Sequence, residues 1–248
     1  MDGCGSFVKE VCSFGEQSTL MRAFLLVLML VLPLQSSPLS EARRVPLQGV
    51  ANARQLGGIP VRGGKVREGW VFRTNSLYGL TAADAVQLRR RGVRSVVDFR
   101  LDWDRKKHPD RADYLASLQH YFWVPMTLNT TPEGYRQMPD EYAPQIRELF
   151  HVLAQAENYP LLYHCAEGKD RTGIATALLL ELLGADREQI VDDYMASRAN
   201  GSRFYVEEAW IRGLFEGVDA AGGIEKYLDL HGVSSLDRDA IRHLLIVP

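Results

Sequence analysis

The sequence is poor in cysteine and in the paired motifs that hold metals. It has 3 cysteines in 248 residues, Cys4, Cys12 and Cys165, and none forms a Cys-x-x-Cys pair. No His-Glu-x-x-His or Gly-x-Ser-x-Gly pattern occurs, and the 6 histidines stand singly. A zinc site and a serine-hydrolase elbow are therefore without support, and we expect no metal and no cofactor.

A strong charge of either sign, internal repeats and low-complexity segments are also absent. The formal net charge is −2, and 46% of the residues are hydrophobic and 24% charged. A net charge of −2 gives no excess of positive charge for binding nucleic acid, so we expect no nucleic-acid partner. The apolar content is sufficient for one core and predicts a single globular domain.

No hydrophobic run is long enough for a comfortable membrane span of roughly 20 residues. The run at residues 23–34 follows Arg22 and precedes a small, polar stretch, which is typical of a secretory signal. We expect residues 1–42 to be an N-terminal extension and signal peptide that starts at Met1 or Met21, with the mature domain at residues 43–248. The protein is then exported, periplasmic or secreted. The alternative is an uncleaved anchor, with membrane contact only through this segment.

The most informative stretch is residues 164–173, His-Cys-Ala-Glu-Gly-Lys-Asp-Arg-Thr-Gly. The short apolar run at residues 160–164 predicts a buried strand, and the helix formers at residues 173–183, which end at Gly184, predict a helix. Cys165 therefore lies at a strand-to-helix turn. The free N–H groups of such a helix start can bind a phosphate dianion.

The side chains of this turn fit phosphate transfer. A cysteine at a helix start beside cations has a lowered pKa, so Cys165 is expected to be a thiolate nucleophile. Arg171 can hold two phosphate oxygens in a bidentate manner, which lysine cannot do. The Thr172 hydroxyl is a candidate donor to the sulfur as it leaves. The expected phosphate-binding residues are Ala166, Glu167, Gly168, Lys169, Asp170 and Arg171.

This pattern resembles the signature of the protein tyrosine phosphatase superfamily, in the His-Cys-x-x-Gly-Lys-Asp-Arg-Thr-Gly form of its atypical bacterial and fungal branch. Four further blocks are similar to that branch, and the match covers roughly residues 45–247. Ala53 and Gln55 depart from the usual Phe and Asp of the first block. The four blocks are residues 52–58, 71–81, 96–100 and 191–195.

The resemblance implies a metal-free phosphatase that forms a cysteinyl-phosphate on Cys165 and hydrolyses it, with phosphotyrosine in proteins as the substrate. Because some members of the branch also act on phosphoinositides, a phosphoinositide or dual-specificity phosphatase is the alternative. Lys169 is either a solvated charge or an attraction for multiply phosphorylated substrates. His164 is either a core histidine or orients the cysteine backbone. A rhodanese-like sulfurtransferase and a phosphate-binding pseudo-enzyme are rivals from other classes.

The general acid is not identified by any motif. Protonation of the leaving oxygen requires a carboxylic acid within hydrogen-bond reach, and Trp123-Val124-Pro125 lacks the Asp of the Trp-Pro-Asp loop that classical relatives use. Asp170 and Asp98 are equal candidates. Asp98 lies at the C-terminal end of a predicted strand, where ligands collect in open α/β sheets, or instead pairs with Arg100 or Arg171. Asp102 and Asp104 are weaker choices.

The remaining chain predicts an α/β fold with a central, mostly parallel sheet flanked by helices. Residues 94–99 and 161–164 are expected to be parallel central strands, and a hairpin turn is expected at residues 62–65. Residues 129–142 are a candidate lid, with Tyr135 or Tyr142 available to stack on a phosphotyrosine ring. The expected helices are residues 81–91, 139–156, 186–197, 202–215 and 235–245.

Overall fold

The computed structural model describes residues 41–127, 129–201 and 205–248, which fall within one compact unit, residues 36–248. Most of the expected signal segment, residues 1–40, lies outside the described residues. No helix in the described part of the chain is both long enough and apolar enough to span a membrane.

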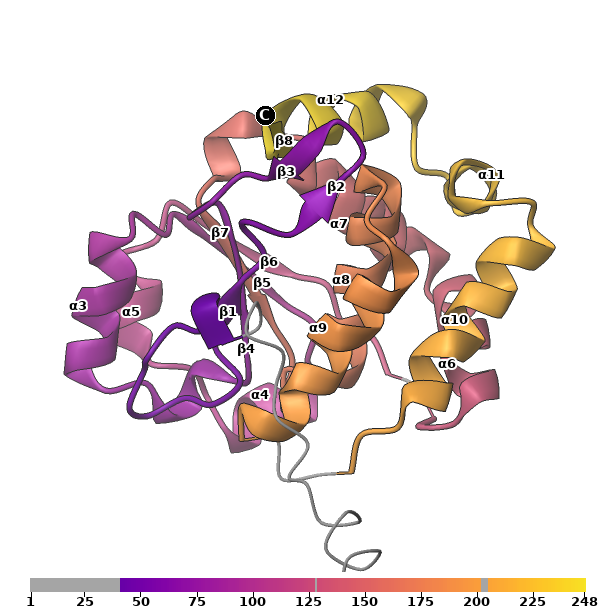
Figure 1. The fold of residues 1–248 in the computed structure, drawn as a ribbon. Helices are drawn as coiled ribbons and strands as arrows, with labels where there is room; N and C mark the ends of the chain where they lie inside the picture. The colour runs from indigo at the N-terminus through magenta and orange to yellow at the C-terminus, as the bar shows by residue number, and fades with distance from the viewer. Residues whose placement is uncertain (1–40, 128, 202–204) are drawn as a thin grey trace, which may run out of the picture. The chain divides into compact units, whose positions relative to one another are not determined.

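A five-stranded sheet forms the centre of this unit (Figure 1). Its strand order is β1-β4-β7-β5-β6, and all neighbours are parallel except β1 and β4. The bounds are β1 Arg54–Gln55, β4 Val71–Thr74, β5 Ser95–Asp98, β6 His120–Trp123 and β7 Leu161–His164. The predicted parallel strands β5 and β7 are adjacent, with β7 in the middle of the sheet.

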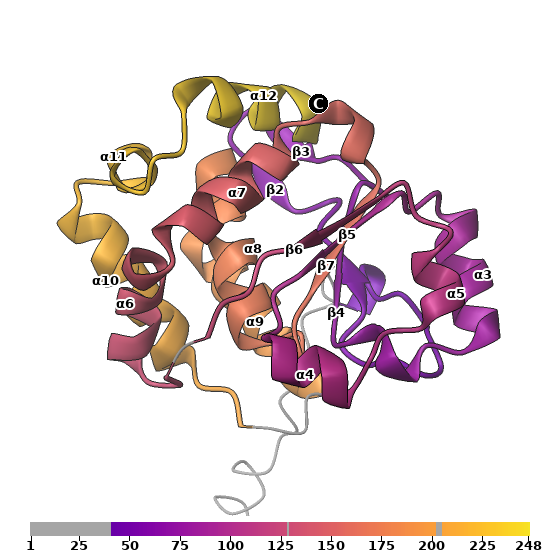
Figure 2. The ribbon, with the colours of Figure 1, turned by 180° about the vertical axis from the view of Figure 1, so that it is seen from behind.

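Helices cover both faces of this sheet (Figures 1 and 2). Helices α3 and α5 lie on one face, and α7, α8 and α9 lie on the other. The helix bounds are α3 Ala82–Arg90, α4 Asp102–Lys107, α5 Ala112–Leu115, α6 Pro132–Glu141, α7 Ala143–Leu153, α8 Asp170–Leu183, α9 Arg187–Ala199, α10 Glu208–Ala220, α11 Ile224–Leu230 and α12 Ser235–Leu245, with 3-10 turns at Leu77–Gly79 (η1) and Ala156–Asn158 (η2). The α/β class is confirmed.

The expected hairpin at residues 62–65 is present in a second, antiparallel sheet. Strand β2 (Pro60–Val61) pairs with β3 (Gly64–Val66), which also pairs with β8 (Ile246–Val247). This small sheet pairs the strand at residues 246–247 with residues 64–66.

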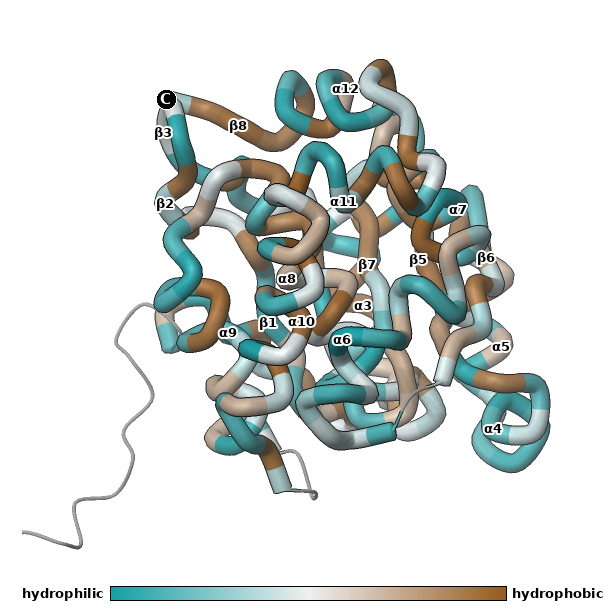
Figure 3. Tube along the Cα trace, turned by 90° about the vertical axis from the view of Figure 1, so that its right-hand side faces the viewer, coloured by the Kyte–Doolittle hydropathy of each residue, from teal (hydrophilic) through white to brown (hydrophobic). Residues whose placement is uncertain are grey.

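Side chains of the central strands alternate between two apolar cores, as the two-residue period of a strand requires. On β7, Leu161 and Tyr163 belong to the core under α7 and α8, whereas Leu162 belongs to the core under α3 and α5. Figure 3 shows the hydrophobic residues on β5 and β7, with a hydrophilic α4 outside them. A sheet that is apolar on both faces must be covered on both, which accounts for the layered fold.

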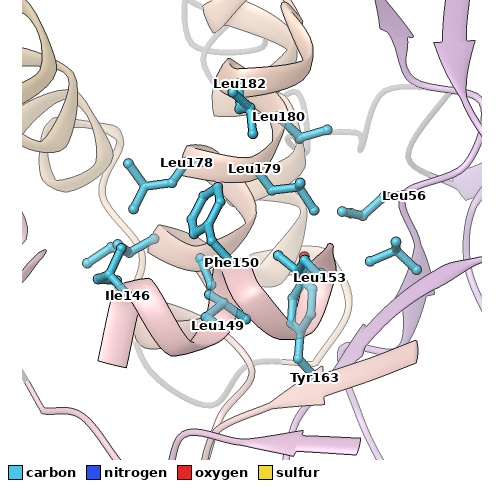
Figure 4. Packing of buried hydrophobic residues seen from close by; sticks show 14 of the residues in the cluster. Leu56, Ile146, Leu149, Phe150, Leu153, Tyr163, Leu178, Leu179, Leu180 and Leu182 are labelled. Atoms are coloured by element: carbon cyan, nitrogen blue, oxygen red, sulfur yellow. The ribbon is translucent and has the colours of Figure 1, made fainter. Parts of the chain in front are cut away.

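Helix α8 is buried along almost its whole length. Its leucines pack in one cluster with side chains of α7, and Tyr163 and Leu56 belong to the same cluster (Figure 4). The helix ends because Gly184 takes a left-handed conformation, with φ of 82°, that a side chain disfavours. Burial on all sides fixes α8, and with it the loop that precedes its first turn.

The expected helix at residues 139–156 is not continuous: it covers the end of α6, all of α7 and the first residue of η2. Thr131 caps α6 by accepting a hydrogen bond from the Gly134 amide at 3.0 Å, and Pro132 occupies the first turn, where its missing N–H costs nothing. Pro139, expected to start a helix, lies inside α6. The candidate lid is therefore largely helical, with Tyr135 and Met138 fully buried.

Candidate active site

The candidate site lies at the carboxyl edge of the central sheet. His164, the last residue of β7, pairs in register with Thr74 of β4 and Asp98 of β5. Residues 165–169 then form the loop that leads into α8. The chain thus places Cys165 at a strand-to-helix turn, as expected, and at the edge where parallel sheets bind ligands.

The loop is held from behind by two buried side chains. Gly168 has φ of 65°, and a Cβ there would come within 2.3 Å of the Thr74 carbonyl oxygen, so only glycine fits. The Gly168 carbonyl accepts hydrogen bonds from Asn52 Nδ2 at 2.9 Å and Arg73 Nη2 at 2.8 Å. The Ser76 amide donates to the Ala166 carbonyl at 3.1 Å. These contacts fix the curvature of the loop.

Behind these contacts, three arginines surround Asp193 of α9. The shortest N···O distances to its carboxylate are 2.6 Å from Arg43, 3.1 Å from Arg54 and 2.7 Å from Arg73. Burial opposes ionisation, but the three guanidinium groups hold the pKa of Asp193 far below its ordinary value. Burial, together with the charge of Arg73, lowers the pKa of Arg54 to about 10. We call Arg43, Arg54, Arg73 and Asp193 the arginine cluster.

Cys165 is buried at the base of the loop, with 1% of its surface exposed. Burial alone raises the pKa of a thiol, yet the charge of Arg171 and the hydroxyl and backbone amide of Thr172 lower the pKa of Cys165 below its ordinary value. These two neighbours therefore favour the thiolate that the sequence leads us to expect. The larger of the two effects comes from Arg171.

The lowered pKa of Cys165 predicts how alkylation of its thiol depends on pH. Because the thiolate is the reactive form, alkylation by iodoacetamide should rise with pH to a plateau whose midpoint lies below that of an ordinary thiol. Arg171→Gln should move the midpoint to higher pH, and Arg171→Lys, which keeps the charge, should move it less. Mass spectrometry of the Cys165 peptide over a pH series measures all three. Equal midpoints in wild type and Arg171→Gln would contradict the assignment.

Arg171 points toward the edge of the sheet rather than into the core. Its Nη1 donates to the carbonyls of Phe99 and Met126, each at 3.3 Å, and lies 3.8 Å from Oδ2 of Asp104 on α4. Backbone oxygens after β5 and β6 thus position the guanidinium. Asp104, a weaker choice for the general acid, is therefore close to Arg171, the residue expected to bind phosphate.

Asp98 is poorly suited to donate a proton. It is fully buried, accepts hydrogen bonds from Arg100 at 2.8 Å and from the Tyr121 hydroxyl at 2.7 Å, and lies 3.9 Å from His164. Burial raises the pKa of a carboxyl, but His164, Arg100 and Tyr121 outweigh it and lower the pKa of Asp98 to about 2. A carboxylate that stays ionised is not a general acid, so the structural pairing of Asp98 with Arg100 is the better interpretation.

Asp170 occupies the first turn of α8 and retains some exposure, 17% of its side chain. It accepts a hydrogen bond from the Tyr135 hydroxyl, which also bonds Tyr194 at 2.7 Å. Lys169 Nζ lies 3.5 Å from the same carboxylate. Tyr135 therefore orients Asp170, and because Tyr135 is fully buried, its predicted stacking on a substrate ring is wrong.

Lys169 is not a solvated loop charge. It is 2% exposed, donates from Nζ to the Tyr205 carbonyl at 2.7 Å, and its Nζ lies 5.1 Å from the centre of the Trp210 ring. The cation–π contact ties the lysine to α10, and the carboxylate of Asp170, on α8, lies beside it. The ammonium group of Lys169 therefore already interacts with Tyr205, Trp210 and Asp170, which leaves less of its charge to attract a substrate.

His164 is a buried histidine with acidic neighbours. Its Nδ1 lies 3.2 Å from the Cys165 carbonyl, and its Nε2 lies 3.3 Å from Asp110. Burial lowers the pKa of an imidazole, but the carboxylates of Asp98 and Asp110 outweigh it and raise the pKa of His164. The contact with the Cys165 carbonyl fits an orienting role for the cysteine backbone.

Asp98, Asp110 and His164 also meet the spacing of metal ligands, as the single such cluster in the described residues. Arg100, however, lies 2.8 Å from the carboxylate of Asp98 and 2.5 Å from that of Asp110. A guanidinium between two carboxylates supplies the positive charge that a metal would bring. These residues therefore form an ion-pair network and are a poor fit to a metal centre.

The sequence is similar to those of several bacterial proteins. It is 33% identical over 181 residues to a protein of Cupriavidus necator provisionally named a tyrosine-protein phosphatase, covering 62% of this chain and 63% of that protein. It is 33% identical over 138 residues to a tyrosine-protein phosphatase of Nostoc commune, covering 50% of this chain and 47% of that protein. It is 31% identical over 172 residues to the triple specificity protein phosphatase PtpB of Mycobacterium tuberculosis, covering 53% of this chain and 62% of that protein.

The match to each of these relatives spans less than two thirds of the relative's length. Among solved structures, TpbA of P. aeruginosa is similar at 19% identity and a TM-score of 0.42, over 68% of this chain and 89% of that one. A model of the tyrosine phosphatase family matches residues 45–247, which is most of the chain and includes every residue of the site described above except Arg43. The chain therefore belongs to the tyrosine phosphatase family.

Proposed function

We propose that this protein is a cysteine-dependent phosphatase that hydrolyses phosphotyrosine in proteins. The observation that carries the proposal is the position of Cys165, at the turn before α8, with its pKa lowered by Arg171 and Thr172. Family membership supports the same activity. A thiolate next to a bidentate cation is the pair of groups that phosphate transfer to a cysteine requires.

The reaction proceeds in two displacements. The Cys165 thiolate attacks phosphorus, so an S–P bond forms and the bond from phosphorus to the tyrosyl oxygen breaks, with a proton delivered to that oxygen. Water then attacks the cysteinyl-phosphate, which releases inorganic phosphate and restores the thiolate. Arg171 holds the phosphoryl oxygens in both steps, and the Thr172 hydroxyl stabilises the departing sulfur.

A phosphoinositide or dual-specificity phosphatase is the second candidate. The similarity to a protein named for triple specificity supports it, as does 35% identity over 71 residues to the inositol diphosphatase DSP4 of Arabidopsis thaliana, over 29% of this chain and 34% of that protein. The buried position of Lys169 weighs against it. The family match weighs against a rhodanese-like sulfurtransferase, and the presence of both Cys165 and Arg171 weighs against a pseudo-enzyme.

Release of inorganic phosphate tests the proposal. The purified protein is given a phosphotyrosine peptide, a phosphoserine peptide of the same sequence, a short-chain phosphoinositide and thiosulfate. We expect the highest kcat/KM on the phosphotyrosine peptide and no sulfur transfer from thiosulfate. A higher kcat/KM on the phosphoinositide would favour the second candidate, and thiosulfate turnover would overturn the proposal.

For the general acid we propose Asp170, since Asp98 stays ionised. A general acid contributes about 10²–10⁴-fold, and most with a basic leaving group. Asp170→Asn should therefore lower kcat on a phosphotyrosine peptide by about 10²-fold and on an activated aryl phosphate by much less. Asp102→Asn is the matched control, because Asp102 is exposed and pairs with Lys106 on the surface. The same selective loss in Asp104→Asn, with Asp170→Asn unaffected, would transfer the role to Asp104.

We also propose that the protein is exported. The hydrophobic run at residues 23–34 and the polar stretch after it support a cleaved signal peptide. Cleavage near Ala42 leaves Arg43, which the arginine cluster requires, in the mature chain. Mass spectrometry of the N-terminus of the protein recovered from outside the cytoplasm tests this. If the protein is found in the membrane fraction and still carries residues 23–34, the uncleaved anchor is the better interpretation.

A further inference from the structure

The segment at residues 43–45 pairs with β1 and so continues the central sheet by one short antiparallel contact. The Gln55 amide donates a hydrogen bond to the Arg43 carbonyl at 2.9 Å. Arg44 forms an antiparallel bridge with Arg54. This backbone pairing fixes the position from which the Arg43 side chain extends.

The two neighbouring arginines of this segment have opposite surroundings. The Arg43 side chain is 9% exposed, whereas that of Arg44 is 52% exposed and lies 3.6 Å from Glu41 at the surface. Successive side chains of an extended chain point to opposite faces, which accounts for the difference. Arg43 is therefore directed toward α9 and Arg44 toward solvent.

Arg43 helps to orient the carboxylate of Asp193. Its Nη1 donates to Oδ1 of Asp193 at 2.6 Å and to the Gln55 carbonyl at 3.2 Å. Arg54 Nε donates to the same Oδ1 at 3.1 Å, whereas Arg73 Nη1 donates to the other oxygen, Oδ2, at 2.7 Å. Because both oxygens belong to one planar group, the contacts on Oδ1 also set the direction of Oδ2.

Two chains of hydrogen bonds lead from Asp193 to the loop that binds phosphate in the proposed reaction. In the first, Arg73 donates from Nη1 to Asp193 and from Nη2 to the Gly168 carbonyl. In the second, Arg54 donates to the side-chain oxygen of Asn52, whose Nδ2 donates to the same Gly168 carbonyl. A displacement of the Asp193 carboxylate is therefore transmitted to Gly168 by both chains.

We propose that Arg43 is a positioning residue for phosphate binding, which acts by holding Asp193 and, through it, the Gly168 carbonyl. The loop at residues 165–169 then keeps the curvature that directs its amides at a phosphate group. The inference rests on the proposed phosphatase function for the identity of the ligand. Since the family match begins at residue 45, the structure that supports the site begins before the matched domain.

Binding of inorganic phosphate to the full chain with Cys165→Ser tests this inference without catalysis. Arg43→Met keeps the apolar stem but removes the donors, so calorimetry should show phosphate affinity about ten-fold weaker, the size expected for a contact that acts through others. Arg43→Lys keeps a cationic donor. Because Nη1 alone makes the contacts with Asp193 and Gln55, the lysine variant should bind phosphate within about three-fold of the parent.

Arg44→Met is the matched control, since it makes the same change at the exposed neighbour. Its phosphate affinity should equal that of the parent. Alkylation of Cys165 in Arg43→Met, with the cysteine restored, gives a second measurement. Its midpoint pH should stay at the wild-type value, because Arg171 and Thr172, which lower the pKa of Cys165, lie on α8. General damage to the site would move this midpoint.

Three results would overturn the inference and leave the phosphatase proposal intact: equal phosphate affinities in Arg43→Met and its parent, an equal loss in Arg44→Met or in Arg43→Lys, or a shift of the alkylation midpoint in Arg43→Met as large as in Arg171→Gln. If Arg43→Met weakens phosphate binding but the wild type hydrolyses no phosphotyrosine, the positioning role is supported and the phosphatase proposal fails. A parent that binds no phosphate would refute the phosphate site and this inference together.

Discussion

Replacement of Cys165 by serine should abolish phosphate release, with a loss of at least about 10⁴-fold in kcat, as the removal of a nucleophile does in other enzymes. Arg171 and Thr172 favour the ionised form of the sulfur, and the thiolate is the form that attacks in the proposed reaction. A serine hydroxyl is much less acidic than a thiol, so the same neighbours leave it protonated. Steady-state phosphate release from a phosphotyrosine peptide measures the effect.

The fold should tolerate this change, because serine is nearly the same size as cysteine. Thermal unfolding and binding of inorganic phosphate serve as controls, and both should stay close to wild type. A serine variant that retains more than about a tenth of the activity would show that another group is the nucleophile. Loss of phosphate binding together with activity would indicate a damaged loop, in which case Cys165→Ala provides the second measurement.

The largest loss of stability is expected for Asp193→Asn, by about 3–5 kcal/mol in the free energy of unfolding. The fully buried carboxylate neutralises part of the charge of Arg43, Arg54 and Arg73. An amide in its place leaves the buried guanidinium groups to repel one another without compensation. Urea unfolding at neutral pH measures the loss.

Asp192→Asn is the matched control, since Asp192 is the exposed neighbour on the same helix. Its free energy of unfolding should change by less than about 0.5 kcal/mol. The folded-state pKa of Asp193 is depressed, so its contribution is present above the unfolded pKa and is lost as the pH falls toward the folded pKa. The difference between wild type and Asp193→Asn should therefore be complete at neutral pH and shrink in strong acid. Equal stabilities of the Asp192 and Asp193 variants would contradict the account.

Local patterns were sufficient to predict the centre of the site. The apolar run before His164 and the helix formers after Gly173 lie close together in sequence, so strand, turn and helix follow from short-range preferences, and β7 and α8 are found there. Helix α12 matches the expected residues 235–245 for the same reason. The cap at Thr131, which starts α6 before Pro139, was a readable signal that the helix prediction did not use.

The parts of the site that depend on distant residues could not be predicted in this way. Asn52, Arg73 and Asp193 were visible only as blocks that resemble a family, and nothing in their spacing says that they support one loop. The state of Asp98 likewise depends on Tyr121 and Arg100, which the sheet and its edge bring to the carboxylate. Ionisation is set by such three-dimensional neighbours, so no linear motif identifies the general acid.

The arginine cluster has a consequence for transfer of this chemistry to other proteins. Residues 164–173 carry the proposed nucleophile and phosphate-binding cation. The groups that hold the Gly168 carbonyl, however, come from residues 52 and 73, and the group that holds Arg73 comes from α9. A graft of these ten residues into another strand-to-helix turn would therefore transfer the reactive side chains without the contacts that curve the loop. A designer would have to import at least three buried polar partners with the motif, and to satisfy each of them in the new core.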